Sequence, residues 1–144
     1  MPIVFELEHK VKPEEIDLLG HVNNLVYLDW FISAAVKHSD SVGWGTARMI
    51  EMGEGWVIRR HEIDYLAQVK PEDTVVIKTW IDSAERTSSV RKYEVVRLSD
   101  GKTVCRGLTV WVWINYNTGR VSRIPEEVNK AFGVAPAAGQ DNGR

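Results

Sequence analysis

The residues best suited to chemistry fall within one short segment, Asp17-Leu-Leu-Gly-His-Val-Asn-Asn24. Asp17 is a candidate base for water or a candidate nucleophile, because a carboxylate held beside a carbonyl carbon can take either role. His21 could orient water or protonate a leaving group, and Gly20 would let a ligand approach the backbone closely. The same residue types are also ordinary turn formers, so their spacing alone leaves both interpretations open.

A strand and a long helix are expected to hold this segment between them. Residues 3–12 alternate between a largely apolar face and a largely charged one, which is typical of a strand with one buried side. From Asn23 or Asn24 to Ser41 the apolar residues follow helical spacing, with Asn23 as a plausible N-cap. A helix start presents unpaired N–H groups and the positive end of the helix dipole. A carbonyl that develops negative charge would therefore be stabilised at this point.

The rest of the chain is predicted to be mainly sheet. Residues 46–55 are expected to be irregular. The later elements are predicted to be strands over residues 56–69, 74–81, 90–98 and 103–115, turns at 99–102 and 117–119, and a short helix from Pro125 to about Phe132. Because the long helix is apolar most of the way round, it needs cover on more than one side. We therefore expect an α+β fold in which one curved antiparallel sheet covers one face of the helix and a second subunit covers another.

The composition narrows the class of protein. A chain of 144 residues that is 44% hydrophobic suits one domain, assigned here to residues 1–133, with residues 134–144 expected to be a flexible tail. The formal net charge of −2 argues against a nucleic-acid partner. No stretch approaches the roughly 20 apolar residues that span a bilayer, and no secretion signal is visible, so a cytoplasmic location is expected. Cys105 is the one cysteine and is expected to lie in the core, and neither a metal nor a cofactor is expected.

The run Asp17-x-x-Gly20-His21-Val22-Asn23-Asn24-x-x-Tyr27 resembles the signature of the hotdog-fold thioesterases. The likeness is to the 4-hydroxybenzoyl-CoA thioesterase-like acyl-CoA hydrolases and to the plant-type acyl-carrier-protein thioesterases. It covers roughly residues 3–132, with supporting markers at Ile63-Asp64-Tyr65-Leu66, Pro71-Glu72-Asp73 and Asn117-Thr118-Gly119-Arg120. The resemblance implies a hotdog α+β fold and hydrolysis of acyl-CoA or acyl-carrier-protein thioesters in fatty acid metabolism. It also implies a homodimer or homotetramer with sites at subunit interfaces, and chemistry without a cofactor.

The resemblance also implies roles for single residues. Asp17 matches the acidic residue that acts as nucleophile or general base, the backbone N–H of Asn24 matches the oxyanion donor, and Gly20 matches the glycine of the substrate loop. His21 matches a histidine that the carrier-protein branch uses in catalysis. That branch has an Asn where this chain has Leu19, which favours a simpler mechanism centred on Asp17.

Substrate contacts are expected from two parts of the chain. Asn23 and Tyr27 lie beside the motif, and Tyr27 is equally suited to the acyl pocket or to the core. Arg86, Ser88 and Arg91 are predicted ligands of coenzyme A, because cations and hydroxyls at a strand entrance can pair with phosphate or pantetheine. The other side chains considered for substrate or phosphate contacts are Arg59, Arg60, Glu62, Asp64, Gln68, Lys92 and Arg123.

Two other functions fit the same segment. A hotdog hydratase or dehydratase acting on acyl thioesters also pairs an acid with a histidine near the central helix, although the Gly20–Asn24 run favours a thioesterase. A non-catalytic acyl-CoA-binding regulator normally carries an extra module, for which this chain has no room beside one fold. Turnover by the pure protein would separate the thioesterase from both.

Overall fold

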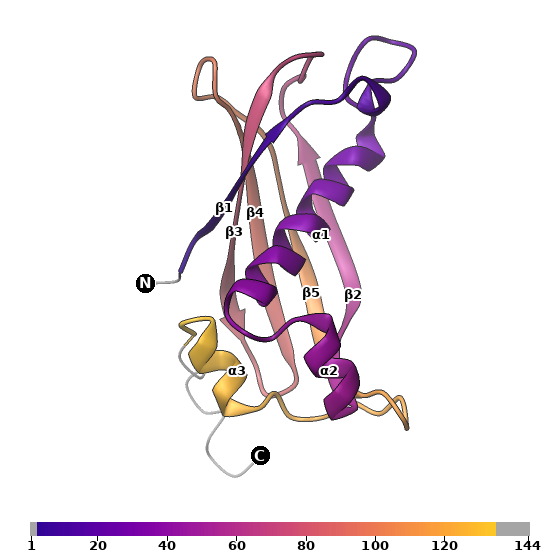
Figure 1. The fold of residues 1–144 in the computed structure, drawn as a ribbon, viewed down its shortest axis with the longest axis vertical. Helices are drawn as coiled ribbons and strands as arrows, with labels where there is room; N and C mark the ends of the chain where they lie inside the picture. The colour runs from indigo at the N-terminus through magenta and orange to yellow at the C-terminus, as the bar shows by residue number, and fades with distance from the viewer. Residues whose placement is uncertain (1–2, 135–144) are drawn as a thin grey trace.

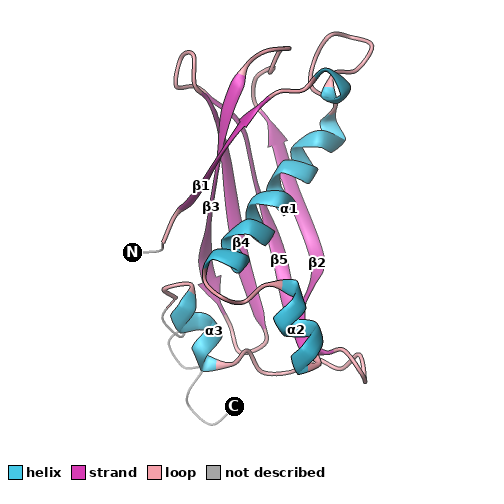
Figure 2. Cartoon of the chain, viewed as in Figure 1, coloured by secondary structure: helices cyan, strands magenta, loops and turns pink. Residues whose placement is uncertain are grey.

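A five-stranded antiparallel sheet and one long helix form most of the structure, a computed structural model that describes residues 3–134 (Figures 1 and 2). The strands are β1 (Phe5–Lys10), β2 (Glu54–Tyr65), β3 (Thr74–Ala84), β4 (Ser88–Arg97) and β5 (Thr103–Asn115). The helices are the 3-10 turn η1 (Pro13–Glu15), α1 (Asn24–Ser41), α2 (Thr46–Met52) and α3 (Glu126–Ala131). The strand order is β1-β3-β4-β5-β2, and every neighbouring pair is antiparallel. The predicted α+β fold, with a curved antiparallel sheet against one long helix, is confirmed.

The sheet buries the face that α1 covers. Along β3 and β4 buried and half-buried residues alternate, as expected when one side of a pleated strand meets the core. On α1, Phe31 is fully buried and stacks on Tyr93 of β4 with ring centroids 4.3 Å apart. A Cβ atom at Gly107 of β5 would lie 2.6 Å from the Phe31 ring. The glycine therefore allows the helix to approach the middle of the sheet.

Helix α1 is buried on one side only within a single chain. Its buried residues are Tyr27, Trp30, Phe31, Ala34, Ala35 and His38. Leu25 is 73% exposed and Val36 is 41% exposed, although both belong to the apolar pattern of the helix. The expectation that one sheet covers one face of the helix is confirmed, and the remaining apolar surface is left without cover in the described chain.

Residues 46–52 correct one sequence expectation. This stretch forms helix α2, whereas the sequence suggested irregular structure. The helix has seven residues and buries only Met49, so the segment is too short to show helical periodicity. It ends at Gly53, whose φ of 80° is the left-handed conformation that favours glycine.

The remaining element bounds differ little from expectation. Strand β2 ends at Tyr65 and not near Val69, while β5 and α1 span the predicted ranges. Asn23 is the N-cap of α1, and its side chain accepts a hydrogen bond from the Leu25 N–H. The N–H of Val134 donates to the carbonyl of Asn129, and residues 135–144 of the predicted tail lie outside the described residues. No helix within residues 3–134 is long and apolar enough to cross a membrane.

Candidate active site

The loop between η1 and α1 folds around Asp17. The backbone N–H of Asp17 donates to the His21 carbonyl over 2.8 Å, and the N–H of Gly20 donates to the Asp17 carbonyl over 3.0 Å. Gly20 has a φ of 80°, so this tight turn is suited to glycine. Asp17 Oδ1 accepts hydrogen bonds from the N–H groups of Leu19, at 2.9 Å, and His21, at 3.4 Å. The backbone of its own loop therefore fixes the orientation of the carboxylate.

His21 lies beside Asp17 without a direct bond between the two side chains. The contact between them runs through the His21 backbone N–H, and no hydrogen bond joins the imidazole to the Asp17 carboxylate in the described structure. The ring lines the same groove as Asp17. Both residues therefore border the same space, and a role of His21 on a bound ligand stays a prediction.

The first turn of α1 faces the same space. Asn23 occupies the N-cap and donates its own backbone N–H to the Glu15 carbonyl over 2.9 Å. Among residues 3–134 the N–H of Asn24 has no hydrogen-bond acceptor, because it precedes the first intrahelical bond. The carbonyl of Asn24 accepts a 3.0 Å hydrogen bond from the Tyr65 hydroxyl. Tyr65, at the end of β2, is thus bonded to the start of α1, and the Asn24 N–H is left without an acceptor among the described residues.

An open groove of about 470 Å³ joins the loop, the helix start and the segment after β2. It brings together five of the residues expected from the motif: Asp17, His21, Asn23, Asn24 and Tyr27. Gly20 belongs to the same loop but does not line the groove. The full lining is Asp17, Leu19, His21, Val22, Asn23, Asn24, Tyr27, Tyr65, Leu66, Ala67 and Gln68.

Tyr27 serves both the groove and the core. Its side chain is buried, and its ring meets Trp30 and Tyr65 edge-on at centroid distances of 5.1 and 5.3 Å. Burial raises the pKa of Tyr27 to about 12, so the hydroxyl stays protonated at neutral pH. The interpretation of Tyr27 as a core residue is therefore confirmed, and its contact with an acyl chain stays a prediction.

A polar cluster around Glu15, next to the Asp17 loop, was not predicted from the sequence. Glu15 Oε1 contacts His9 Nε2 at 2.8 Å and accepts from the Lys12 N–H, while Glu15 Oε2 accepts from Trp30 Nε1 at 2.9 Å. Burial acts to raise the pKa of Glu15, but the hydrogen bonds from His9, Lys12 and Trp30 lower it overall. The partners lie three to fifteen residues away along the chain, so no local motif indicates them.

Tyr65 was also missed as a residue of the groove. The sequence predicts a strand that continues to Val69, so Tyr65 is expected in mid-strand, whereas it is the last residue of β2. The same early strand end brings Leu66, Ala67 and Gln68 to the groove. Gln68, a candidate for substrate contacts, lines the groove of its own chain.

The three predicted coenzyme A ligands do not share this groove within one chain. Arg86, Ser88 and Arg91 lie around the β3–β4 turn, at the opposite end of α1 (Figure 1). Arg86 is exposed and Ser88 is half-buried. Arg91 is only 3% exposed, and its guanidinium bonds to His38 and Thr79. Contact of Arg86, Ser88 and Arg91 with coenzyme A stays a prediction.

Two other features of the described residues bear on the chemistry. Cys105 is fully buried in β5, and burial raises the pKa of its thiol to about 12, which confirms a core residue and disfavours a thiolate nucleophile. Within residues 3–134 no group of three His, Cys, Asp or Glu side chains is arranged to hold a metal ion.

The sequence is similar to those of known thioesterases. Residues 11–132 match the sequence model of the thioesterase-like superfamily. A chloroplastic acyl-acyl carrier protein thioesterase of Arabidopsis thaliana is 27% identical over 128 residues, which cover 89% of this chain and 68% of that protein. A palmitoyl-acyl carrier protein thioesterase of the same plant is 32% identical over 132 residues, or 88% of this chain and 32% of that protein. The matched region thus spans from about one third to about two thirds of the length of these relatives.

A solved structure shows the same fold. The 1,4-dihydroxy-2-naphthoyl-CoA thioesterase of Synechocystis superposes with a TM-score of 0.84, over 90% of this chain and 96% of that one, at 19% identity. This likeness confirms the hotdog fold expected from the motif. The family match covers most of the chain, including the Asp17 loop, the helix and every strand from β2 to β5. The chain belongs to the thioesterase-like superfamily.

Proposed function

We propose that this protein hydrolyses acyl thioesters to a free acid and a thiol. One observation carries the proposal: backbone N–H groups fix the Asp17 carboxylate in a groove that Asn24 also lines, and among residues 3–134 the Asn24 N–H has no hydrogen-bond acceptor. A carboxylate and an oxyanion donor on one groove are what attack on a carbonyl carbon requires. Membership of the thioesterase-like superfamily supports this assignment.

In the proposed reaction, Asp17 either attacks the thioester carbonyl or removes a proton from an attacking water. The carbonyl oxygen becomes negative as the tetrahedral intermediate forms, and the Asn24 N–H at the start of α1 stabilises it. Collapse of the intermediate breaks the carbon–sulfur bond and releases the thiolate, to which His21 supplies a proton. If Asp17 attacks directly, water then hydrolyses the resulting anhydride and restores the carboxylate.

The substrate is proposed to be an acyl-CoA or an acyl-carrier-protein thioester. The names of the relatives include both kinds, a carrier-protein thioesterase and a naphthoyl-CoA thioesterase. The groove offers apolar and aromatic surface next to the reacting groups. Leu19 and Leu66, which are 79% and 47% exposed, are suited to contact an acyl chain or a partner.

A homodimer or homotetramer in the cytoplasm is proposed as the working form. Strand β2 forms one edge of the sheet, and its backbone can pair with a second copy. Val57 and Ile58 on this strand and Leu25 on α1 are exposed apolar side chains. Their burial in an assembly would supply the second cover that the apolar pattern of α1 indicates.

A thiol-release assay over a series of acyl-CoA and acyl-carrier-protein substrates tests the reaction. Asp17→Ala is expected to lower turnover by about 10²–10⁴, the usual contribution of a positioned base. Asp17→Asn keeps the shape and removes the charge, so it should be equally inactive. The control is Asp29→Ala on the exposed side of α1, which should keep normal turnover. Full activity of Asp17→Ala would contradict the proposal.

The same protein samples separate the other possibilities. Addition of water to crotonyl-CoA without release of thiol would identify a hydratase. Tight binding of acyl-CoA with neither reaction would identify a non-catalytic binding protein. Either result overturns hydrolysis as the function of this groove.

A further inference from the structure

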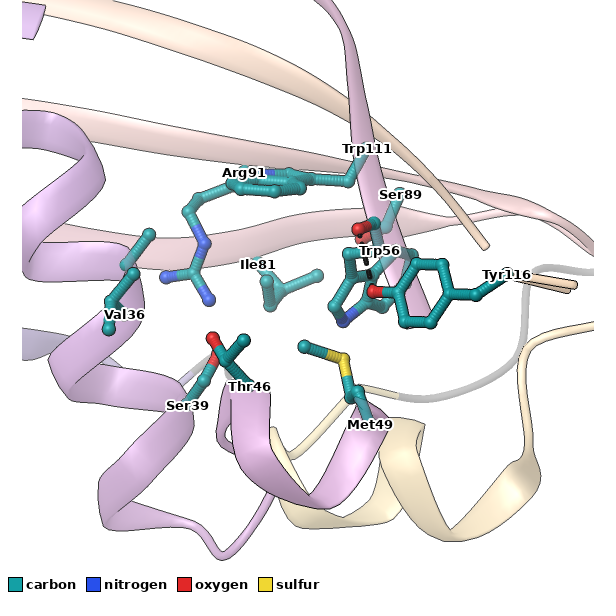
Figure 3. A pocket seen from close by; sticks show the side chains of 11 residues that line it. Val36, Ser39, Thr46, Met49, Trp56, Ile81, Ser89, Arg91, Trp111 and Tyr116 are labelled. Carbon is teal, nitrogen blue, oxygen red and sulfur yellow. Dashed lines mark hydrogen bonds between the residues drawn. The ribbon is translucent and has the colours of Figure 1, made fainter. Parts of the chain in front are cut away.

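A second pocket lies at the other end of α1, enclosed between that helix, α2 and the sheet (Figure 3). Its cavity volume is about 140 Å³. The pocket shares no lining residue with the groove that holds Asp17. Its apolar and aromatic walls come from Val36, Met49, Trp56, Ile81, Trp111 and Tyr116. The position and character of this pocket set it apart from the candidate active site.

One charged side chain points into these apolar walls. Arg91 of β4 is 3% exposed, and Figure 3 shows its guanidinium directed into the space between Val36 and Ile81. Arg91 Nη1 donates to His38 Nδ1 over 3.0 Å and to Thr79 Oγ1 over 2.9 Å. Both bonds use the same nitrogen, so they hold the side chain from one side and leave the remaining N–H groups facing the pocket.

The positive charge of Arg91 has no counter-charge in the described structure. None of the ion pairs among residues 3–134 includes Arg91. Burial, together with the Arg91 charge, lowers the pKa of His38 to about 4, so this histidine is neutral at neutral pH. Burial lowers the pKa of Arg91 itself to about 10, which still leaves it protonated. The Phe132 ring lies against the guanidinium, 5.5 Å from Cζ to the ring centroid, but it carries no opposite charge. Burying a charge without a counter-charge is costly, so a bound anion would offset this cost.

The pocket therefore selects for two features in one molecule. The planar guanidinium fork matches the geometry of a carboxylate, and the aromatic walls favour an apolar body. A dry cavity of about 150 Å³ is known to hold one benzene molecule, which sets the scale for this pocket. We propose that the pocket binds a small organic carboxylate with an apolar body, of the size of benzoate or hexanoate, at Arg91.

Such a carboxylate could be a free acid or the far end of an acyl thioester. From Asn24 to His38 the distance along α1 is about 21 Å at the usual rise of 1.5 Å per residue. The two cavities also share no walls. Both observations favour a free carboxylate, bound separately from the thioester site. The proposal does not depend on hydrolysis, because it rests on Arg91 and its pocket alone.

Binding is tested directly by NMR titration of the full chain with benzoate and with benzamide. The indole N–H signals of Trp56 and Trp111 report on the pocket walls. Benzoate should shift both signals in a saturable manner, while neutral benzamide should bind at least ten-fold more weakly. Hexanoate and hexanamide form a second matched pair with an aliphatic body. Equal binding of acid and amide would overturn the proposal.

Two variants locate the site. Arg91→Gln should weaken benzoate binding at least ten-fold, whereas Val36→Trp keeps the charge and fills the pocket mouth at a position that is 41% exposed. The matched control is Lys37→Trp, on the exposed side of the same helix and outside the pocket lining. If Arg91→Gln fails to fold, Val36→Trp decides the matter, and unchanged benzoate binding in that variant contradicts the site.

The source of the carboxylate is decided by a second comparison. Thiol release from a carboxyl-terminated acyl-CoA such as adipoyl-CoA is measured in the wild type and in Val36→Trp. A free-acid site predicts the same rate in both proteins. A loss of turnover for adipoyl-CoA but not for hexanoyl-CoA would assign the pocket to the acyl end of the substrate, and absence of hydrolysis with intact benzoate binding would refute only the proposed enzyme.

Discussion

The two ends of helix α1 hold polar groups in opposite ways. At its start, the Asp17 loop is open to solvent, and backbone N–H groups of the same short segment orient the carboxylate. Near its end, Arg91 and His38 are enclosed, and their contacts come from strands and helices far apart in the sequence. The open end suits a reaction that must admit and release a large substrate, while the closed end suits a small, permanently buried charge or its ligand.

The comparison also concerns how each end obtains its stability. The Asp17 loop depends on local hydrogen bonds and on Glu15, and its apolar side chains Leu18 and Leu19 are largely exposed. The Arg91 end is surrounded by rings, with Phe5 stacked on His38 at 5.2 Å and Phe132 edge-on at 5.0 Å. Changes at the first end should therefore alter function more than stability, and changes at the second should alter stability more than turnover.

The largest effect on stability is expected where the two ends share a core. Phe31→Ala removes a fully buried ring stacked on Tyr93 and should lower the free energy of unfolding by about 3–5 kcal/mol in urea titrations. Val36→Ala, at a position that is 41% exposed, is the control and should cost less than about 1 kcal/mol. Hydrogen exchange should show both ends of α1 loosened in Phe31→Ala. Loosening of one end alone would show that the two ends fold as separate units.

The enclosed end should control part of the pH dependence of stability. Burial, together with the Arg91 charge, lowers the pKa of His38 to about 4, while the unfolded histidine titrates near 6.5. The unfolded chain therefore binds a proton first as the pH falls below 6.5, so the stability present at pH 7 is lost progressively down to about pH 4. This group alone should cost about 2 kcal/mol between pH 7 and pH 5.

His38→Gln tests this assignment. Urea unfolding of the wild type and the variant at several pH values from 7 to 5 gives the two slopes. The variant should lack the His38 share of the pH dependence, although its stability at pH 7 is lower because a buried side chain has changed. Equal slopes in the two proteins would show that His38 is not the titrating group.

At the start of α1, loss of the helix cap should lower the free energy of unfolding by about 1 kcal/mol. Asn23→Ala removes the bond to the Leu25 N–H, and loss of such a cap typically costs about 1 kcal/mol. Asn24→Ala is the matched change, because it keeps the backbone N–H that is the proposed oxyanion donor. Turnover in Asn24→Ala should stay within a few-fold of the wild type. A loss as large as that of Asp17→Ala would mean that the Asn24 side chain takes part.

The smallest effect on stability is expected when the hydroxyl of Tyr65 or of Tyr116 is removed, one near each end of α1. Tyr65→Phe removes the bond to the Asn24 carbonyl, and Tyr116→Phe removes the bond to the Trp56 carbonyl. Each should cost about 0.5 kcal/mol of stability, near the low end for a net hydrogen bond, because both side chains are partly exposed. Only Tyr65→Phe should raise KM in the thiol-release assay. An equal change in KM for Tyr116→Phe would connect the two ends functionally.

The sequence by itself determined the α+β fold, the helix with its Asn23 cap and the Asp17–Asn24 segment, because these depend on local patterns. Alternation, helical spacing and capping each act over a few residues, so they are legible along the chain. The sequence did not predict the short helix α2 or the early end of β2, because too few residues are buried there to produce a regular hydrophobic pattern.

Only the tertiary structure decided which residues meet across the molecule. Glu15 joins His9 and Trp30, Tyr65 crosses to the start of α1, and Arg91 turns inward to His38, fifty-three residues away along the chain. Strand periodicity says which face a side chain occupies, but the neighbours on that face depend on how sheet and helix pack. For this reason Asp17 was found from its own segment, whereas the buried charge at the far end of the same helix was not.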